Sequence, residues 1–157
     1  YVLVNLGILD KPYNFLTQPF AAKIVIILAL LWRWTGYNMV FFLSGLQNIE
    51  YSVYEAAKID GASAIQTFFK ITVPLLKPTI LLTAIMSTNG TLQLFDESIN
   101  LTDGGPANAS ISMSHYIYNL CFKYVPNFGY AAAMSFFILL LVAVLAFIQM
   151  RVGDKRD

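Results

Sequence analysis

The sequence is poor in charge, in cysteine and in histidine. Only 12% of its residues are charged and 57% are hydrophobic, whereas an ordinary soluble domain has roughly 25% charged residues. The single cysteine, Cys121, excludes an intrachain disulfide, and together with the single histidine, His115, it suggests no metal cluster. The chain has no Gly-x4-Gly-Lys-Ser/Thr loop to cradle phosphates. Its net charge of +1 gives no reason to expect nucleic-acid binding. This composition is typical of a membrane protein.

Three long apolar runs predict an all-α fold with three transmembrane helices. Residues 129–150 carry no charge and exceed the ~20 apolar residues that span a hydrocarbon core. The other two runs are residues 78–95 and residues 24–49, the latter interrupted by Arg33. We prefer an Arg33 that snorkels its guanidinium to the outer interface over an Arg33 with a role in a polar pathway.

The distribution of lysine and arginine predicts the orientation, since cytoplasmic connections have the excess of both residues. The predicted cytoplasmic residues are Lys58, Lys70, Lys77, Arg151, Lys155 and Arg156, and those on the outer side are Lys11, Lys23 and Lys123. The connection 50–77 and the C-terminal tail are therefore expected in the cytoplasm, with the N-terminal segment and residues 96–128 outside. The chain begins at Tyr1 without a signal-peptide pattern. We expect it to be the C-terminal portion, residues 1–157, of a longer membrane domain whose N-terminal helices are missing.

The connection 50–77 contains two Ser-x-x-Glu/Gln patterns. Ser52 precedes Glu55 by three residues, and Ser63 precedes Gln66 by three. In such a capping box the serine side chain bonds the amide of the third helical residue, whose own side chain bonds the serine amide. Two short helices are therefore predicted.

The ends of these helices follow from glycine and proline. The first helix is expected over residues 53–60 and is ended by Gly61, whereas the second is expected over residues 64–72 and is ended by Pro74. Both would protrude from the membrane as a hairpin.

The same loop resembles the signature loop of a known family, the permease subunits of bacterial binding-protein-dependent ABC importers. The matching residues are Glu55, Ala56, Ala57, Gly61, Ile71 and Pro74, and the one departure is Val73 in place of leucine. Further agreement in residues 32–39, 45–47 and 101–106 resembles the carbohydrate branch of that family and covers essentially the whole chain.

The resemblance implies a type I ABC-importer permease fold and a coupling role for the loop. The first loop helix would dock in a cleft of a cytoplasmic ATPase. The coupling residues implied are Glu55, Ala56, Ala57, Asp60, Gly61, Ile71 and Pro74, with apolar anchors at Tyr54, Ile59, Phe68 and Phe69. The alternative is a surface hairpin with good caps, in which Glu55 is only a capping carboxylate.

Polar residues within the predicted helices suggest a solute pathway, because polar groups that face lipid are costly. At helical spacing Ser87, Thr91 and Leu94 fall on one face of the second span, and Asn89, Gln93 and Asp96 on another. The resemblance assigns the first face to a sugar site, with Trp34, Tyr37 and Asn38 on the preceding helix. The alternative is hydrogen bonding between helices, a common use of such residues in membrane bundles.

The outer connection offers a candidate surface. Apolar residues between Ser112 and Lys123 follow helical spacing, so this segment is expected to lie along the outer face and to present to a binding protein. Asp96 and Glu97 are expected at the interface, because paired carboxylates suggest acid–base chemistry only across a closed cleft.

Together these features lead us to expect a non-enzymatic permease subunit of a sugar, sugar-phosphate or polyol importer in the bacterial inner membrane. It would hold no cofactor itself, since ATP binds the partner subunit. The partners implied are an ABC ATPase dimer, a second homologous permease subunit, an extracytoplasmic solute-binding protein and membrane lipid. The alternatives are a membrane scaffold, which needs no polar pathway, and an integral-membrane enzyme, for which the spans offer only Arg33.

Overall fold

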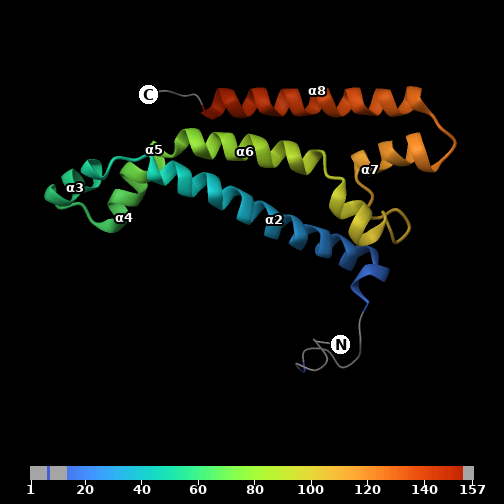
Figure 1. Ribbon diagram of the computed structural model, residues 1–157, viewed down its shortest axis with the longest axis horizontal. Coiled ribbons are helices and arrows are strands. Elements are labelled where there is room, and N and C mark those ends of the chain that lie inside the picture. Colours follow the sequence, from blue (N-terminus) through green and yellow to red (C-terminus); the bar gives the residue numbers. More distant parts are fainter. Residues whose placement is uncertain (1–6, 8–13, 154–157) are drawn as a thin grey trace. The chain divides into compact units, whose positions relative to one another are not determined.

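The computed structural model describes residue 7 and residues 14–153, and this part of the chain is helical throughout its regular structure. Figure 1 shows the elements in chain order. They are a 3₁₀ turn η1 (Phe15–Thr17), α2 (Pro19–Gln47), α3 (Tyr51–Ile59), α4 (Ala64–Thr67), α5 (Val73–Leu75), α6 (Lys77–Leu92), α7 (Met113–Tyr118) and α8 (Phe128–Gly153), with π-helical turns η2 (Phe68–Thr72), η3 (Ser98–Thr102) and η4 (Asn119–Lys123). The all-α expectation is confirmed.

The predicted outer N-terminal segment with Lys11, and the tail residues Lys155 and Arg156, lie outside the described residues. The chain forms two compact units. The first unit comprises Tyr1–Leu31 and Gln93–Phe136, and the second unit comprises Trp32–Leu92 and Phe137–Asp157.

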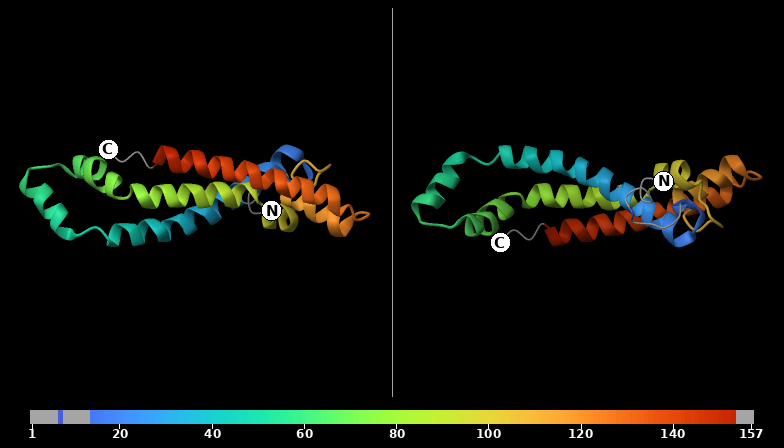
Figure 2. Two further views of the ribbon diagram at one scale, coloured as in Figure 1. Left: turned by 90° about the horizontal axis from the view of Figure 1, so that it is seen from above. Right: turned by 90° about the horizontal axis from the view of Figure 1, so that it is seen from below.

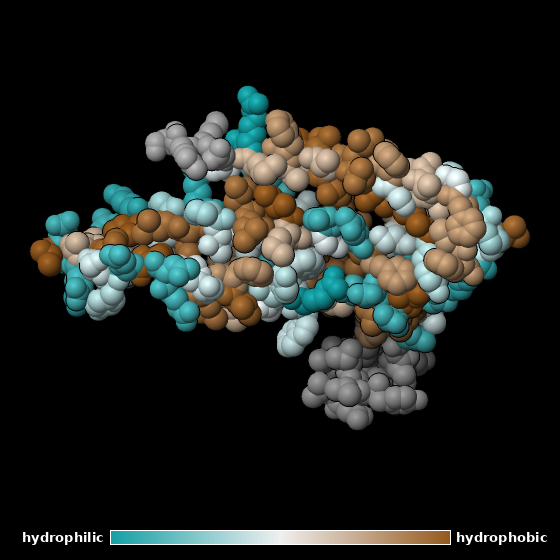
Figure 3. All heavy atoms as spheres, turned by 45° about the horizontal axis from the view of Figure 1, so that its top comes forward, coloured by the Kyte–Doolittle hydropathy of each residue, from teal (hydrophilic) through white to brown (hydrophobic). Residues whose placement is uncertain are grey.

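Among the described residues, two helices, α2 and α8, are long and apolar enough to cross a membrane, and their side chains are largely uncovered. Trp32 is 85% exposed and Phe136 is 68% exposed, and Figure 3 shows much apolar surface in brown. Monomeric soluble proteins rarely expose such large apolar areas, so these helices need lipid or partner helices around them.

The middle span differs from the expectation. Helix α6 stops at Leu92 and is too short to pass the same test alone, but Ala64–Leu75 and Lys77–Leu92 pass it together as a pair bent by 64°. The predicted helical run to residue 95 is therefore wrong. The run Ser87–Gln93 is rich in residues of low helix propensity, including Thr, Asn and Gly, which weakens the last turns.

Within the second unit α2 and α6 pack antiparallel, as both views of Figure 2 show. Three contacts set their register. Gly45 lies against Thr79 near one end, Asn38 bonds Ser87 in the middle, and Trp34 lies over Gly90 at the other end. Helix α8 joins α6 through a hydrogen bond of 2.8 Å from Gln149 Nε2 to Thr88 Oγ1.

In the first unit a buried histidine organises the connection between α6 and α8. His115 and Ser98 are fully buried, and 2.8 Å separates His115 Nδ1 from Ser98 Oγ. Ser98 Oγ also donates to the Ser110 carbonyl and accepts from the Ser112 amide. This network ties η3 to the start of α7, and the Phe95 ring packs edge to face on His115, so polar and aromatic contacts together hold this segment.

Candidate coupling loop and polar pathway

The first helix of the loop begins earlier than predicted. Helix α3 starts at Tyr51 with Glu50 as its N-cap and makes no side-chain capping bond. The Ser52 hydroxyl instead donates to the Glu50 carboxylate at 3.3 Å. The predicted capping box of Ser52 and Glu55 is therefore wrong, because the earlier start places Ser52 inside the first turn. Glu55 is left exposed on α3.

The capping box at Ser63 is confirmed. The Gln66 amide donates to Ser63 Oγ at 3.3 Å, and the Ser63 amide donates to Gln66 Oε1 at 2.9 Å. Two of the unpaired donors at the start of α4 are satisfied in this way.

Gly61 ends α3 as predicted. Its φ of +74° lies in the left-handed region that glycine adopts without strain. The Gly61 amide donates to the Lys58 carbonyl, and the Ala62 amide donates to the Ala57 carbonyl. These two bonds form a Schellman motif, which fixes the direction in which the chain leaves the helix.

Pro74 does not end the second loop helix, so that prediction is wrong. The helical path continues from α4 through η2 to Leu75, and the sharp bend follows at Leu76. A proline removes one backbone hydrogen bond and its ring crowds the carbonyl four residues earlier. The π-helical turn η2, which ends at Thr72, includes Lys70, the residue four before Pro74, so the crowded carbonyl lies in the wider part of the helix.

The two arms of the loop are bonded to each other. The Tyr54 hydroxyl lies 3.2 Å from Thr72 Oγ1, and Thr72 is buried. Ala57 is also buried, whereas Ala56 and Asp60 are exposed. Ala57 and Tyr54 therefore stabilise the loop itself. Ala56 and Asp60 lie on the exposed face of α3, where a partner could contact them.

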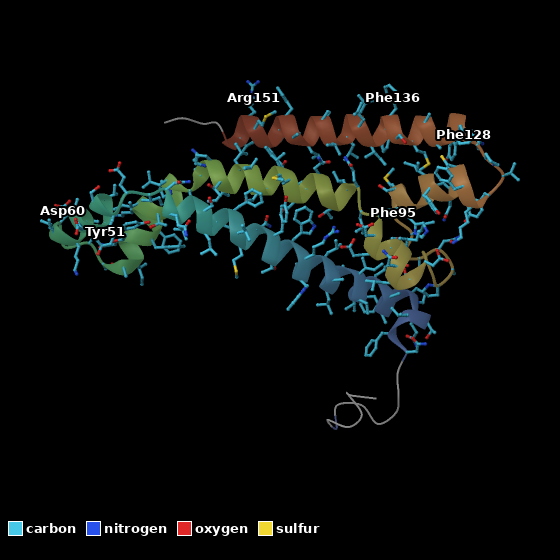
Figure 4. The ribbon with its side chains drawn as sticks, viewed as in Figure 1. Tyr51, Asp60, Phe95, Phe128, Phe136 and Arg151 are labelled. Atoms are coloured by element: carbon cyan, nitrogen blue, oxygen red, sulfur yellow. The ribbon has the colours of Figure 1, made fainter. Side chains whose placement is uncertain are left out.

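Large apolar side chains of the loop are left uncovered. Ile59 is 86% exposed, and the other members of this set are Tyr51, Ile65, Phe68 and Phe69. Tyr51 and Asp60 mark the two ends of α3 in Figure 4. Exposed apolar anchors beside charged residues such as Lys58 and Lys70 have the composition of a protein interface.

The structure brings together four of the predicted pathway residues. Asn38 Nδ2 donates to Ser87 Oγ at 3.0 Å, and 3.3 Å separates Ser87 Oγ from Asn38 Oδ1. One turn away, Trp34 and Tyr37 meet edge to face with ring centroids 5.5 Å apart. Asn38 and Ser87 thus make the interhelical bond that was the alternative to a solute contact.

The other predicted pathway residues do not join this cluster. Thr91 is exposed, and Asn89 lines a small cavity against α8. Gln93 and Leu94 belong to the first unit and lie beyond the end of α6. The predicted helical faces that include Leu94, Gln93 and Asp96 are therefore wrong, because the helix stops at Leu92.

Arg33 lies beside the aromatic residues of α2. Its guanidinium carbon is 5.6 Å from the Trp34 ring centroid, a cation–π contact.

Sequence reasoning missed three features of the two units. The Thr88–Gln149 bond could have been suspected, since Gln149 is the sole amide in the apolar run 129–150. The burial of His115 and the close approach of Trp34 to Gly90 leave no trace in residue spacing, because both depend on elements far apart in the chain.

The histidine cluster has a defined electrostatic setting. Burial lowers the pKa of His115, the first and largest effect, while Asp103 acts against it. His115 Nε2 is 3.6 Å from Asp103 Oδ1. Lys123 Nζ bonds both Asp103 carboxylate oxygens, at 2.8 and 2.9 Å, and this bond lowers the pKa of Asp103 and raises that of Lys123.

Comparison with known proteins places these features in one family. The family model described as "Binding-protein-dependent transport system inner membrane component" matches residues 1–156. The lactose transport system permease protein LacF of Rhizobium radiobacter is 54% identical over 156 residues, which cover 98% of this chain and 52% of that protein. A putative ABC transporter permease protein, ORF1 of Caldicellulosiruptor sp. (strain Rt8B.4), is 36% identical over 80% of this chain and 91% of its own length.

A solved structure shows the same fold. It is a bacterial ABC transporter involved in the import of the acidic polysaccharide alginate, with a TM-score of 0.83, 24% identity, and coverage of 99% of this chain and 54% of the matched chain. The chain spans about half the length of most of the curated relatives described as sugar permeases. The chain belongs to the family of inner-membrane components of binding-protein-dependent transport systems, and it is a membrane protein of the ABC-importer permease fold rather than an enzyme.

Proposed function

We propose that this chain is part of the membrane-spanning subunit of an ATP-driven sugar importer. Its exposed loop would transmit the opening and closing of a separate ATPase dimer to the membrane helices. The observation that supports this best is the loop itself, with Gly61 at φ +74° and a row of uncovered apolar side chains around α3. The loop is braced by the Tyr54–Thr72 contact and runs directly into α6, so a force on α3 would reach a membrane helix.

A second permease subunit and an extracytoplasmic binding protein complete the proposed assembly. Uncovered apolar side chains on α2 and α8 leave room for a partner subunit as well as lipid. The loop and the C-terminus would face the cytoplasm, in keeping with the lysine and arginine counts. ATP binding would shift an equilibrium between inward-facing and outward-facing states, which requires that nucleotide favour one state over the other.

The solute that we propose to test first is a disaccharide of the lactose type. This choice is supported by the relative named as a lactose permease, which matches 98% of this chain. The aromatic rings of Trp34 and Tyr37, which meet edge to face, suit a sugar face.

Gly61 provides a sharp test of coupling. Gly61 has no other atoms within 4 Å of an added Cβ, so a substitution there acts through the backbone and not through a clash. In the full-length importer, Gly61→Val should strain the left-handed turn, weaken ATPase co-purification and reduce ATP-driven lactose uptake. Gly61→Asn is the matched control, because asparagine tolerates this conformation.

Coupling through this loop would be contradicted if the Gly61→Val and Gly61→Asn variants showed equal lactose uptake and equal co-purification of the ATPase. Replacement of the whole hairpin by a flexible tether extends the test. Unchanged uptake after that replacement would overturn the proposal.

A further inference from the structure

Trp34 of α2 lies directly on the backbone of α6 at Gly90. A Cβ built on Gly90 would be 2.3 Å from Cζ2 and 2.6 Å from Cη2 of the Trp34 ring, far inside ordinary contact. We propose that Gly90 is a positioning residue that fixes Trp34 and thereby sets the size of sugar that the permease accepts. This inference rests on the proposed transport function.

The Trp34 ring is held on several sides. Its edge-to-face contact with Tyr37 joins it to Phe41, whose ring centroid is 5.2 Å from that of Tyr37. The Arg33 guanidinium lies over the Trp34 ring. With these neighbours and the α6 backbone around it, the indole cannot accommodate a methyl group at Gly90 without leaving its position.

The position of the ring matters because of what lies next to it. The Asn38–Ser87 pair is one helical turn from Trp34 and Gly90 on both helices. The indole Nε1 is buried without an acceptor among the described residues. The ring atoms nearest an added Cβ at Gly90 are Cζ2, Cη2 and Cε2, the edge next to Nε1, so a shift that makes room for a methyl group also moves this unpaired donor.

An added methyl group would move the indole by about 1 Å or more, because ordinary contact begins at 3.4 Å. Binding groups must stay within about 0.5 Å of their productive positions. Because the clash is with α6, the displaced ring moves away from that helix and changes its position relative to the Asn38–Ser87 pair. A larger sugar should lose more than a smaller one.

The test uses the full-length importer with its ATPase and binding protein in proteoliposomes. Gly90→Ala should raise the KM for lactose about tenfold with little change in maximal rate, and raise the KM for a monosaccharide much less. Gly129→Ala is the matched control, since a Cβ there meets no atom within 4 Å. Trp34→Leu together with Gly90→Ala should restore lactose KM to that of Trp34→Leu alone, because the clash is removed.

A second readout needs no transport. In the full-length permease, the emission that is lost on Trp34→Phe substitution reports the surroundings of the Trp34 ring, whatever other tryptophans the assembly holds. Gly90→Ala should shift this emission, and Gly129→Ala should leave it unchanged. If neither the wild type nor any variant transports either sugar, the proposed lactose-type solute is wrong, while the emission shift still tests the Gly90 contact by itself.

Two results would overturn the inference. One is an unchanged emission and an unchanged KM ratio in Gly90→Ala. The other is an equal loss for both sugars, which would make the contact merely structural. Should the Gly90→Ala variant fail to assemble, the Trp34→Leu variant decides the question by itself. Trp34→Leu replaces the indole by a smaller side chain and is expected to lower the KM for a trisaccharide relative to the KM for lactose. An unchanged ratio of these two KM values would contradict the inference.

Discussion

Small residues decide how closely α2 approaches α6. A Cβ on Gly45 would be 2.8 Å from Thr79 Oγ1 and 2.9 Å from Leu76 Cδ2, and Leu76 is itself buried. Together with the contact at Gly90, this brings the two helices together at both ends of the Asn38–Ser87 pair.

Gly45→Ala should therefore destabilise the helix pair. Overpacking typically costs about 1–3 kcal/mol of folding free energy. Replacing glycine by alanine within a helix gains only roughly 1 kcal/mol in helix propensity. We expect a cost near the upper end of the overpacking range, so that the net effect is destabilising. Gly36→Ala on the same helix meets no atom within 4 Å and is the control, since it has the propensity gain without the clash. Thermal unfolding of the full-length permease in detergent measures both. A Gly45→Ala variant as stable as Gly36→Ala would contradict the close approach.

Ser63 and Ser52 allow a paired prediction about helix capping, since only Ser63 of the two caps a helix. Ser63→Ala should remove a capping bond worth about 1 kcal/mol and speed hydrogen exchange of the α4 amides about fivefold. Ser52→Ala removes only a bond to the exposed Glu50 carboxylate, so exchange of the α3 amides should hardly change. Mass spectrometry of the deuterated loop peptides gives both values. Equal acceleration at the two serines would show that Ser52 caps α3 after all.

At the scale of elements, the link between α6 and α8 depends on one buried imidazole. His115 joins η3 to α7 through Ser98, and its other nitrogen faces Asp103, which Lys123 holds from the outside. The burial of a neutral histidine makes this connection sensitive to acid. The pKa of His115 in the folded segment is lowered from its ordinary value of 6.5.

The sign of the pH effect follows from proton binding. Above pH 6.5 His115 is neutral both in the folded and in the opened segment, so the full stability is present. As the pH falls below 6.5, the opened segment binds a proton that the folded segment does not, and stability is lost progressively toward the lowered pKa. Hydrogen exchange of the α7 amides, corrected for the intrinsic rate, should show weaker protection at acid pH. In His115→Asn this pH dependence should disappear; its persistence would point to Asp103 or Lys123 instead.

At the scale of the whole molecule, α8 is expected to cross the membrane with its start outside and its end in the cytoplasm. Val125 before α8 is 89% exposed, and Arg151 at its end is also exposed. In a background where Cys121 and any other cysteine of the full-length permease are replaced by serine, Val125→Cys should react with a membrane-impermeant maleimide added to cells whose outer membrane is permeabilised. Arg151→Cys should react only after the inner membrane is permeabilised. The reverse pattern would invert the proposed orientation, and labelling of both from outside would show that α8 does not span.

Much of the architecture followed from the residues in order along the chain. The apolar runs predicted α2 and α8, Ser63 and Gln66 predicted the start of α4, and Gly61 predicted the end of α3, because each of these depends on neighbours a few residues away. The resemblance in the loop residues led to the family that the comparisons confirm.

Other features were not predicted, some for local reasons and some because they depend on contacts between distant segments. Pro74 was tolerated because a π-helical turn precedes it, and α6 ended at Leu92 although its apolar character extends further. Packing likewise decided that Ser87 bonds Asn38, that Ala57 faces inward, and that Trp34 lies on Gly90. The sequence by itself determined a membrane-embedded helical chain with a capped loop, since composition, periodicity and local hydrogen bonds are fixed within a few turns. Only the tertiary structure decided which polar and small residues meet, because that depends on the register between helices, which no spacing within one helix specifies.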